Sequence, residues 1–188
     1  MIEIPQCTPM GFEKIKVPAE TWDLIQEIYP LLKRYETLEY FSGKEYFIQG
    51  TGNSTIFPID KVPHHRDAIH NQLHKLHQDW AGREIEPSYL YGIRSYKNGT
   101  ILKMHTDMVQ THHIASIISV DKDINNLEDW GLNIIDHSGT EHIIYLEPGE
   151  MILYESAICK HGRPTAFKGN FYNNLFVHYK FKLENNGN

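Results

Sequence analysis

The tripeptide His105-Thr106-Asp107 and the distant His161 are the residues whose types and spacing suggest chemistry. Side chains at i and i+2 of a β-strand project to the same face, so the imidazole of His105 and the carboxylate of Asp107 are expected to point the same way. His161 comes 54 residues after Asp107, far enough for several short strands to return the chain beside the pair. Two histidines and one carboxylate on one face leave metal positions open and suit non-haem Fe(II). The pattern therefore predicts a metal centre of His105, Asp107 and His161.

The second half of the chain has the texture that could position such ligands. Short runs of β-branched and aromatic residues alternate with turns rich in Gly, Pro and Asn from Tyr89 onward. Many short strands of this kind, preceded by helices rather than alternating with them, favour an antiparallel jelly roll over a parallel α/β sheet. We expect strands at 89–96, 100–107, 113–120, 131–136, 141–146, 150–155 and 171–181.

The first half is expected to support this core. Apolar residues repeat at helical spacing over 18–34 and again over 61–81, which predicts two amphipathic helices that buttress one sheet. Pro30 is expected to bend or end the first helix. Short strands and turns are expected over 35–60. This segment is also a candidate for a hairpin or lid that covers the substrate. The whole prediction is one mostly β domain, 1–188, with a helical support and lid over 1–88, a jelly-roll catalytic core over 89–182 and a disordered tail over 183–188.

Composition excludes several classes of protein. With 18 Lys and Arg against 24 Asp and Glu, the net charge of −6 disfavours a nucleic-acid partner, because such binding relies on neutralising phosphates. The sequence has no run of about 18 apolar residues, which is the length that a bilayer-spanning helix needs. The first ten residues do not resemble a secretory signal. Cys7 and Cys159 form no paired pattern, so we expect free thiols and a cytoplasmic location. The sequence leaves the oligomeric state open.

The segment 91–179 resembles the 2-oxoglutarate- and Fe(II)-dependent oxygenases of the prolyl 4-hydroxylase type. The resemblance covers about the last half of the chain, and its elements recur in the family's order. The matching stretches are RSYKNGTILKMHTD (94–107), HIASIISVD (113–121), WGLNII (130–135), LEPGEMILYES (146–156) and CKHGRPTAFKGNFYNNLFVHY (159–179). Within them the family's Tyr, Gly, His-x-Asp, Pro-Gly and distal His and Pro correspond to Tyr96, Gly99, His105, Asp107, Pro148-Gly149, His161 and Pro164.

This resemblance implies a double-stranded β-helix in which His105, Asp107 and His161 hold Fe(II). It also implies 2-oxoglutarate as cosubstrate and O₂ as oxidant, with ascorbate left open as an auxiliary reductant. The implied reaction is hydroxylation of an unactivated C–H bond, most directly on a peptidyl proline. Similar cores act on lysine, on free amino acids and on small molecules. The substrate is therefore either a peptide or protein, or a small molecule.

The resemblance also implies residues that contact 2-oxoglutarate, with one departure. Related enzymes carry a Lys or Arg about ten residues after the distal histidine, where this chain has Asn170 or Phe171. A buried carboxylate still needs a cation or several donors. Arg163 is the favoured substitute and Lys168 the next, with Lys103 as a third candidate.

Three further side chains are candidates for the same pocket. Tyr96 matches the tyrosine that positions the cosubstrate, and Ser119 is expected to donate a hydrogen bond from the opposite strand. His178 has the strand parity of Asn174, so it too could face the pocket.

Other histidines have simpler interpretations. His70, His74 and His77 share one helical face, where a solvated edge is favoured over a helical metal site. The pair His112-His113 is expected to be a solvated loop more than part of the site.

Alternative functions also remain. They are a cupin-like metal-binding protein and a degenerate oxygenase fold that binds a partner without iron. A halogenase-like relative is rejected, because its carboxylate ligand would be replaced and Asp107 is present.

Overall fold

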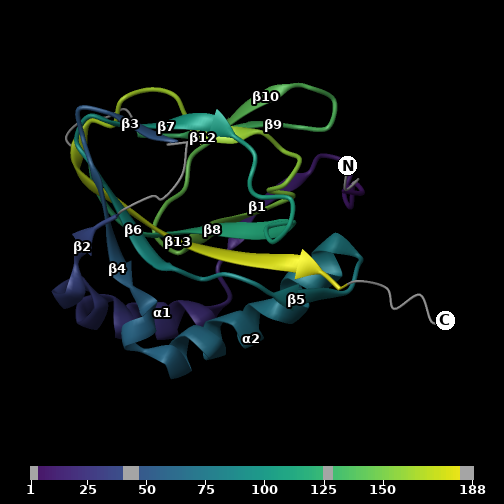
Figure 1. The fold of residues 1–188 in the computed structure, drawn as a ribbon, viewed down its shortest axis with the longest axis horizontal. Coiled ribbons are helices and arrows are strands. Elements are labelled where there is room, and N and C mark those ends of the chain that lie inside the picture. Colours follow the sequence, from purple (N-terminus) through teal and green to yellow (C-terminus); the bar gives the residue numbers. More distant parts are fainter. Residues whose placement is uncertain (1–3, 40–46, 125–128, 183–188) are drawn as a thin grey trace.

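Two antiparallel sheets lie face to face, and two helices cover the outer side of the larger sheet (Figure 1). This computed structural model describes residues 4–39, 47–124 and 129–182. The helical segments are α1 (Ala19–Leu32), η1 (Lys33–Tyr35), η2 (Ile59–Lys61) and α2 (Pro63–Ala81). The strands are β1 (Phe12–Lys16), β2 (Thr37–Leu38), β3 (Ile48–Gly50), β4 (Ser54–Pro58), β5 (Ile85–Pro87), β6 (Gly92–Lys97), β7 (Thr100–His105), β8 (Ile114–Ile124), β9 (Leu132–Ile135), β10 (Glu141–Ile144), β11 (Glu150–Tyr154), β12 (His161–Arg163) and β13 (Gly169–Phe181).

Strands β6 to β13 form the core of the fold. The larger sheet contains β11, β8, β13 and β6 in that order, and the smaller one contains β10, β9, β12 and β7. Successive strands thus alternate between the two sheets, except that β9 and β10 are neighbours in the smaller one, and this is the winding of a double-stranded β-helix. The preceding segments extend both sheets, because β1, β4, β2 and β5 join the larger sheet and β3 pairs with β7. The predicted jelly roll is confirmed.

Strand β13 shows how the two faces of the larger sheet divide the core. Leu175 and Val177 pack in the cluster that the two helices cover, together with Ile28 of α1 and Leu73 of α2. Alternate residues such as Tyr172 face the interior between the sheets. The helices therefore buttress the larger sheet as predicted, while the interior between the sheets holds two further apolar clusters together with several buried polar side chains.

Several sequence-based expectations differ from the structure. Strand β7 ends at His105, so Asp107 lies in the following loop, where its backbone N–H donates to the carbonyl of Ser156. The short strand β12 was not predicted, although it carries His161. Helix α1 continues two residues past Pro30. Residues 40–46 of the expected lid and the expected tail at 183–188 lie outside the described residues.

The histidines of α2 are a clear correction. His70 and His77 are buried, with centroid distances of 5.5 and 4.6 Å from the ring of Tyr179. A solvated face is therefore wrong for both, because α2 turns this side toward β13. Burial lowers the pKa of each imidazole to about 4. In the described ranges the only group of three or more residues able to share a metal ion is elsewhere, at His105, Asp107 and His161.

A search of the described helices for membrane spans finds none that is both long and apolar enough.

Candidate metal centre

Three predicted ligands converge where β7 and β12 meet in the smaller sheet. His105 ends β7, and His161 begins β12 directly opposite it in the antiparallel register. Asp107 approaches from the loop after β7. One ligand atom from each residue can be chosen so that all three lie within 4.8 Å of one another. The convergence that the sequence predicted is therefore present in the fold.

The two imidazoles expose the same nitrogen to the carboxylate. Oδ1 of Asp107 lies 3.6 Å from Nε2 of His105 and 3.8 Å from Nε2 of His161. The other ring nitrogens donate to backbone carbonyls: Nδ1 of His105 to Lys103 at 2.8 Å, and Nδ1 of His161 to Cys159 at 2.9 Å. A hydrogen bond at Nδ1 fixes the tautomer whose Nε2 lone pair is available to a metal. The donor set fits a divalent metal held by two imidazoles and one carboxylate.

Electrostatics favour the ligand protonation states. Burial, together with the neighbouring charge of His161, lowers the pKa of His105 to about 4. Burial by itself would raise the pKa of Asp107, but the contact with His178 and the charges of His161, His178 and His105 hold it well below its usual range. Near neutral pH the site therefore presents a neutral imidazole at His105 and a carboxylate at Asp107, as metal binding requires.

Arg163 is buried in the interior between the sheets, two residues after His161. Only 1% of it is exposed, and its guanidinium lies 4.8 Å from the ring of Trp130 and 4.5 Å from that of Tyr172. Nη1 donates to the carbonyl of Trp130, while Nη2 is buried and has no hydrogen-bond partner among the described residues. A buried cation with an unused donor is costly unless an anion completes it.

A second guanidinium of this region, that of the partly buried Arg94, is paired with Glu39. Nε and Nη2 of Arg94 bind the two carboxylate oxygens at 2.7 and 2.6 Å, which is a bidentate ion pair. Lys168 and Lys103, the other cations named from the sequence, are both exposed at the surface. Among these cations, Arg163 is the one that combines full burial with an unused donor.

Uncharged polar groups accompany Arg163 in the interior. Tyr96 is fully buried, its hydroxyl accepts a hydrogen bond from Arg94 and its ring lies edge-on to Trp130. Ser119 and Asn174 are paired residues of β8 and β13 and are also fully buried. In the described part of the chain the Ser119 hydroxyl and both amide atoms of Asn174 have no hydrogen-bond partner. Sequence analysis noted Asn174 only through its parity with His178.

Aromatic rings lie beside the triad. The ring of Phe47 stacks on His105 at a centroid distance of 4.3 Å. Tyr91 lies edge-on to His178, 6.2 Å away, and stacks on Tyr89 at 5.2 Å. Both tyrosines keep 40% or more of their surface exposed. These rings give the surroundings of the metal centre an apolar, accessible wall.

The pair His112-His113 also differs from expectation. His112 is 5% exposed, and its ring lies 5.1 Å from that of Tyr89 and 4.1 Å from that of His178. His113 is 9% exposed and bonds to the carbonyl of Val109. A solvated loop pair is therefore wrong, and His112 belongs to the aromatic group beside the triad. The sequence alone does not show whether two adjacent histidines are solvated in a loop or buried beside a site.

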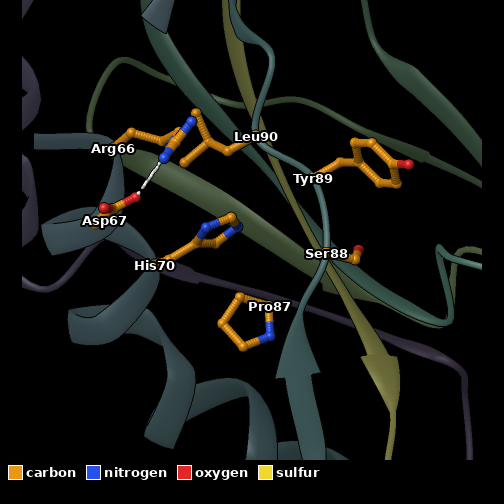
Figure 2. Close-up of a pocket in the computed structure, with 7 residues that line it drawn as sticks. All are labelled: Arg66, Asp67, His70, Pro87, Ser88, Tyr89 and Leu90. Atoms are coloured by element: carbon orange, nitrogen blue, oxygen red, sulfur yellow. Dashed lines mark hydrogen bonds and ion pairs between the residues drawn. The ribbon is translucent and has the colours of Figure 1, made fainter. Parts of the chain in front are cut away.

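A surface cavity of about 390 Å³ lies between α2 and residues 87–90. Figure 2 shows Arg66 paired with Asp67 on one side of it and the Tyr89 ring projecting away from His70. None of the three metal-ligand candidates lines this cavity. The cavity is therefore separate from the metal centre.

Comparisons with known proteins bear on this geometry. No family model matches the sequence, and no curated protein matches it at sequence level. Solved structures do. A prolyl-4-hydroxylase from Pseudomonas putida shares 14% identity, with 93% of this chain and 94% of that one covered and a TM-score of 0.63. HygX from Streptomyces hygroscopicus, with nickel and 2-oxoglutarate bound, shares 12% identity over 93% of this chain and 84% of that one, with a TM-score of 0.65. A Trichoplax adhaerens prolyl hydroxylase, in complex with a hypoxia inducible factor peptide fragment, shares 10% identity over 90% and 83%, with a TM-score of 0.64.

The chain therefore has the fold of the 2-oxoglutarate- and Fe(II)-dependent oxygenases. Within that class its architecture is of the prolyl 4-hydroxylase type, as the resemblance over 91–179 implied. The structural match covers 93% of this chain, so it extends well beyond the segment 91–179 to which the sequence resemblance was limited.

Proposed function

We propose that the protein is an Fe(II)- and 2-oxoglutarate-dependent dioxygenase that hydroxylates an unactivated C–H bond. The observation that carries this proposal is the convergence of His105, Asp107 and His161 in this fold. Their Nε2 and carboxylate atoms would hold the iron and leave part of its coordination sphere to other ligands. Bound iron would supply the oxidative chemistry, while the protein holds the three ligands and orients the substrate.

The buried Arg163 supports 2-oxoglutarate as the cosubstrate. Its unused Nη2 would bind the carboxylate remote from the metal, which would compensate a charge that is otherwise poorly paired. The hydroxyl of Ser119 and the amide of Asn174 are further unsatisfied groups in the same interior. Tyr96 would line the same space. Lys168 is the weaker candidate because it is exposed.

For the substrate we propose a peptidyl proline. Support comes from the apolar wall of Phe47, Tyr89 and Tyr91 beside the triad, because aromatic faces suit a small uncharged ring. The P. putida and T. adhaerens proteins with this fold are prolyl hydroxylases, and the latter is in complex with a peptide. A small molecule remains the alternative, since HygX has also been solved with hygromycin B bound.

The test is an anaerobic titration with Fe(II) followed by 2-oxoglutarate. The expected result is a weak visible charge-transfer band, because the keto acid chelates the iron. The His161→Ala variant, which removes one ligand from the same fold, should lack the band. Aerobic incubation should then convert 2-oxoglutarate to succinate, faster with a proline-containing peptide than without it.

The outcomes separate the alternatives. Metal binding without the band would favour a cupin-like protein. Neither metal binding nor the band would favour a degenerate fold that acts as a binding module. The band and succinate formation without stimulation by any proline-containing peptide would keep the oxygenase and reject the prolyl substrate.

A further inference from the structure

The turn between β11 and β12, residues 155–159, contacts two of the three metal-ligand candidates. The carbonyl of Ser156 accepts the backbone N–H of Asp107 at 2.9 Å. The carbonyl of Cys159 accepts the Nδ1–H of His161, also at 2.9 Å. One turn therefore holds both the loop that carries the carboxylate and the ring of one imidazole.

Glu155 begins this turn and is bound to the segment 7–11, which lies almost 150 residues earlier in the chain. Only 1% of Glu155 is exposed. Its carboxylate accepts the backbone N–H of Cys7 at 2.9 Å, and both the backbone N–H and the hydroxyl of Thr8 at 2.8 Å. Its own backbone N–H donates to the carbonyl of Gly11 at 2.9 Å. Four hydrogen bonds to one short segment therefore fix the first residue of the turn.

Thr8 and Gly11 shape the segment for this contact. The Thr8 hydroxyl accepts the N–H of Gly11 at 2.9 Å while it donates to Glu155, so a single hydroxyl both folds the segment and ties it to the turn. Gly11 has a φ of 84°, and a Cβ there would collide with Sγ of Cys159. Glycine tolerates this backbone conformation and lets the segment lie directly on the turn.

We propose that Thr8 is a positioning residue for the metal centre. Its hydroxyl fixes Glu155 and with it the turn, whose carbonyls orient Asp107 and His161. The hydrogen bonds at both ends of this connection measure 2.8–2.9 Å, which is normal for a good hydrogen bond. Partners behind a metal ligand set its orientation, so a looser turn should weaken metal binding. The inference rests on the proposed function, since it assigns a role toward the metal that the triad would hold.

The experiment uses Thr8→Val, which replaces the hydroxyl by a methyl group, and has two readouts. The first is amide hydrogen exchange of the metal-free protein, followed by NMR. The backbone N–H of Asp107 should exchange about 3- to 10-fold faster than in the wild type, the effect of about one hydrogen bond, because this N–H is bonded to the turn.

The second readout is the affinity for Co(II), a stable stand-in for Fe(II), measured by calorimetry. We expect the affinity of Thr8→Val to fall about 3- to 10-fold, on the same scale of one hydrogen bond. The visible spectrum of the bound ion should also change, because it reports the geometry of the ligands. Thr8→Ser keeps the hydroxyl and should restore the exchange rate, the affinity and the spectrum.

Thr21→Val is the matched control. Thr21 is 1% exposed, and its hydroxyl donates to Oε1 of Gln72 at 3.0 Å, which joins α1 to α2 outside the larger sheet. This variant also loses one side-chain hydrogen bond, but far from the turn. Its Asp107 exchange rate and its Co(II) affinity should therefore stay within about twofold of the wild type. Thermal melting of each metal-free variant shows whether it is folded, and Thr8→Ala replaces Thr8→Val if the added methyl group prevents folding.

The outcomes distinguish failure of this inference from failure of the proposed function. If the wild type binds Co(II) and folded Thr8→Val binds it equally tightly, Thr8 has no positioning role, whatever the exchange rate of Asp107, and the proposed function survives. Equal losses in Thr8→Val and Thr21→Val would mean a general loss of stability and would also overturn the inference. If the wild type binds no Co(II) at all, the proposed function fails and this inference fails with it.

Discussion

Replacing Arg163 by methionine tests the interior of the barrel most directly. The guanidinium is 1% exposed, bonds to a single carbonyl through Nη1 and leaves Nη2 unsatisfied within the described residues. Methionine has a similar length and fills the space between the rings of Trp130 and Tyr172 without a charge. The variant therefore separates the packing of this side chain from its capacity to bind an anion.

Two opposite terms set its effect on the unliganded protein. Loss of the charged hydrogen bond from Nη1 costs about 1.5–3 kcal/mol, while removal of the unsatisfied donor Nη2 gains about 1–3 kcal/mol. We therefore expect the free energy of unfolding to change by less than about 2 kcal/mol. Breaking a fully paired buried ion pair would instead cost about 3–5 kcal/mol. Chemical denaturation measures this difference.

The effect on 2-oxoglutarate binding should be much larger. Removing one partner of a buried charge pair costs about 2–5 kcal/mol, which corresponds to about 30-fold to about 4,000-fold in Kd. The assay is calorimetry with Mn(II) present under anaerobic conditions, comparing the wild type with Arg163→Met and with Arg163→Lys, which keeps a charge but lacks the bidentate fork. If Arg163→Met binds 2-oxoglutarate as the wild type does, the anchor is another residue, and the buried charge of Arg163 needs a different explanation.

Three other changes have predictable outcomes. Asp107→Ala should abolish measurable Co(II) binding in calorimetry, because two imidazoles alone hold the ion poorly; unchanged binding would remove Asp107 from the site. Burial lowers the pKa of His77 from 6.5 to about 4, because the folded protein holds the neutral ring. The contribution of this ring to the free energy of unfolding is therefore complete above pH 6.5 and is lost as the pH falls toward 4. The loss reaches about 3 kcal/mol at 1.36 kcal/mol per pKa unit, and denaturation curves of wild type and His77→Leu should differ in pH dependence over that window, whereas parallel curves would contradict it. Glu155→Ala should destabilise the fold by about 2–4 kcal/mol in chemical denaturation, since the buried Glu155 carboxylate accepts the backbone N–H groups of Cys7 and Thr8; a change below about 1 kcal/mol would show that this clamp is unimportant.

The sequence predicted the fold well because its strands are marked by local signals. Gly and Pro turns bound most strands of the barrel, and β-branched or aromatic residues are frequent in long strands such as β8 and β13. Strand β12 escaped prediction because it has three residues, too few for a period to register. Its existence depends on pairing with β7 and β9, and pairing between distant segments is not encoded in any local window.

The site was predictable only in part for the same reason. His105, Asp107 and His161 stand out because their types are those of metal ligands. Burial of His77 was not predictable, because the polar face of α2 packs on Tyr179 of a strand roughly a hundred residues later in the chain. The surroundings of His178 likewise join β13 to the loops after β5 and β7.

One short strand explains how the interior accommodates its opposite charges. The carboxylate of Asp107 lies next to His161, at the end of the barrel where β12 begins. Arg163 lies on β12 as well, two residues after His161. Two strand residues span about 6–7 Å, comparable with the length of a five-carbon diacid. Enzymes that this chain resembles carry the cation early in the last strand, but here the interior-facing Tyr172 of β13 packs its ring on the guanidinium of Arg163. Under the proposed function the cation would thus come from the smaller sheet, with a ring of the larger sheet packed on it, and a missing basic residue at 170 or 171 would not imply a missing anchor.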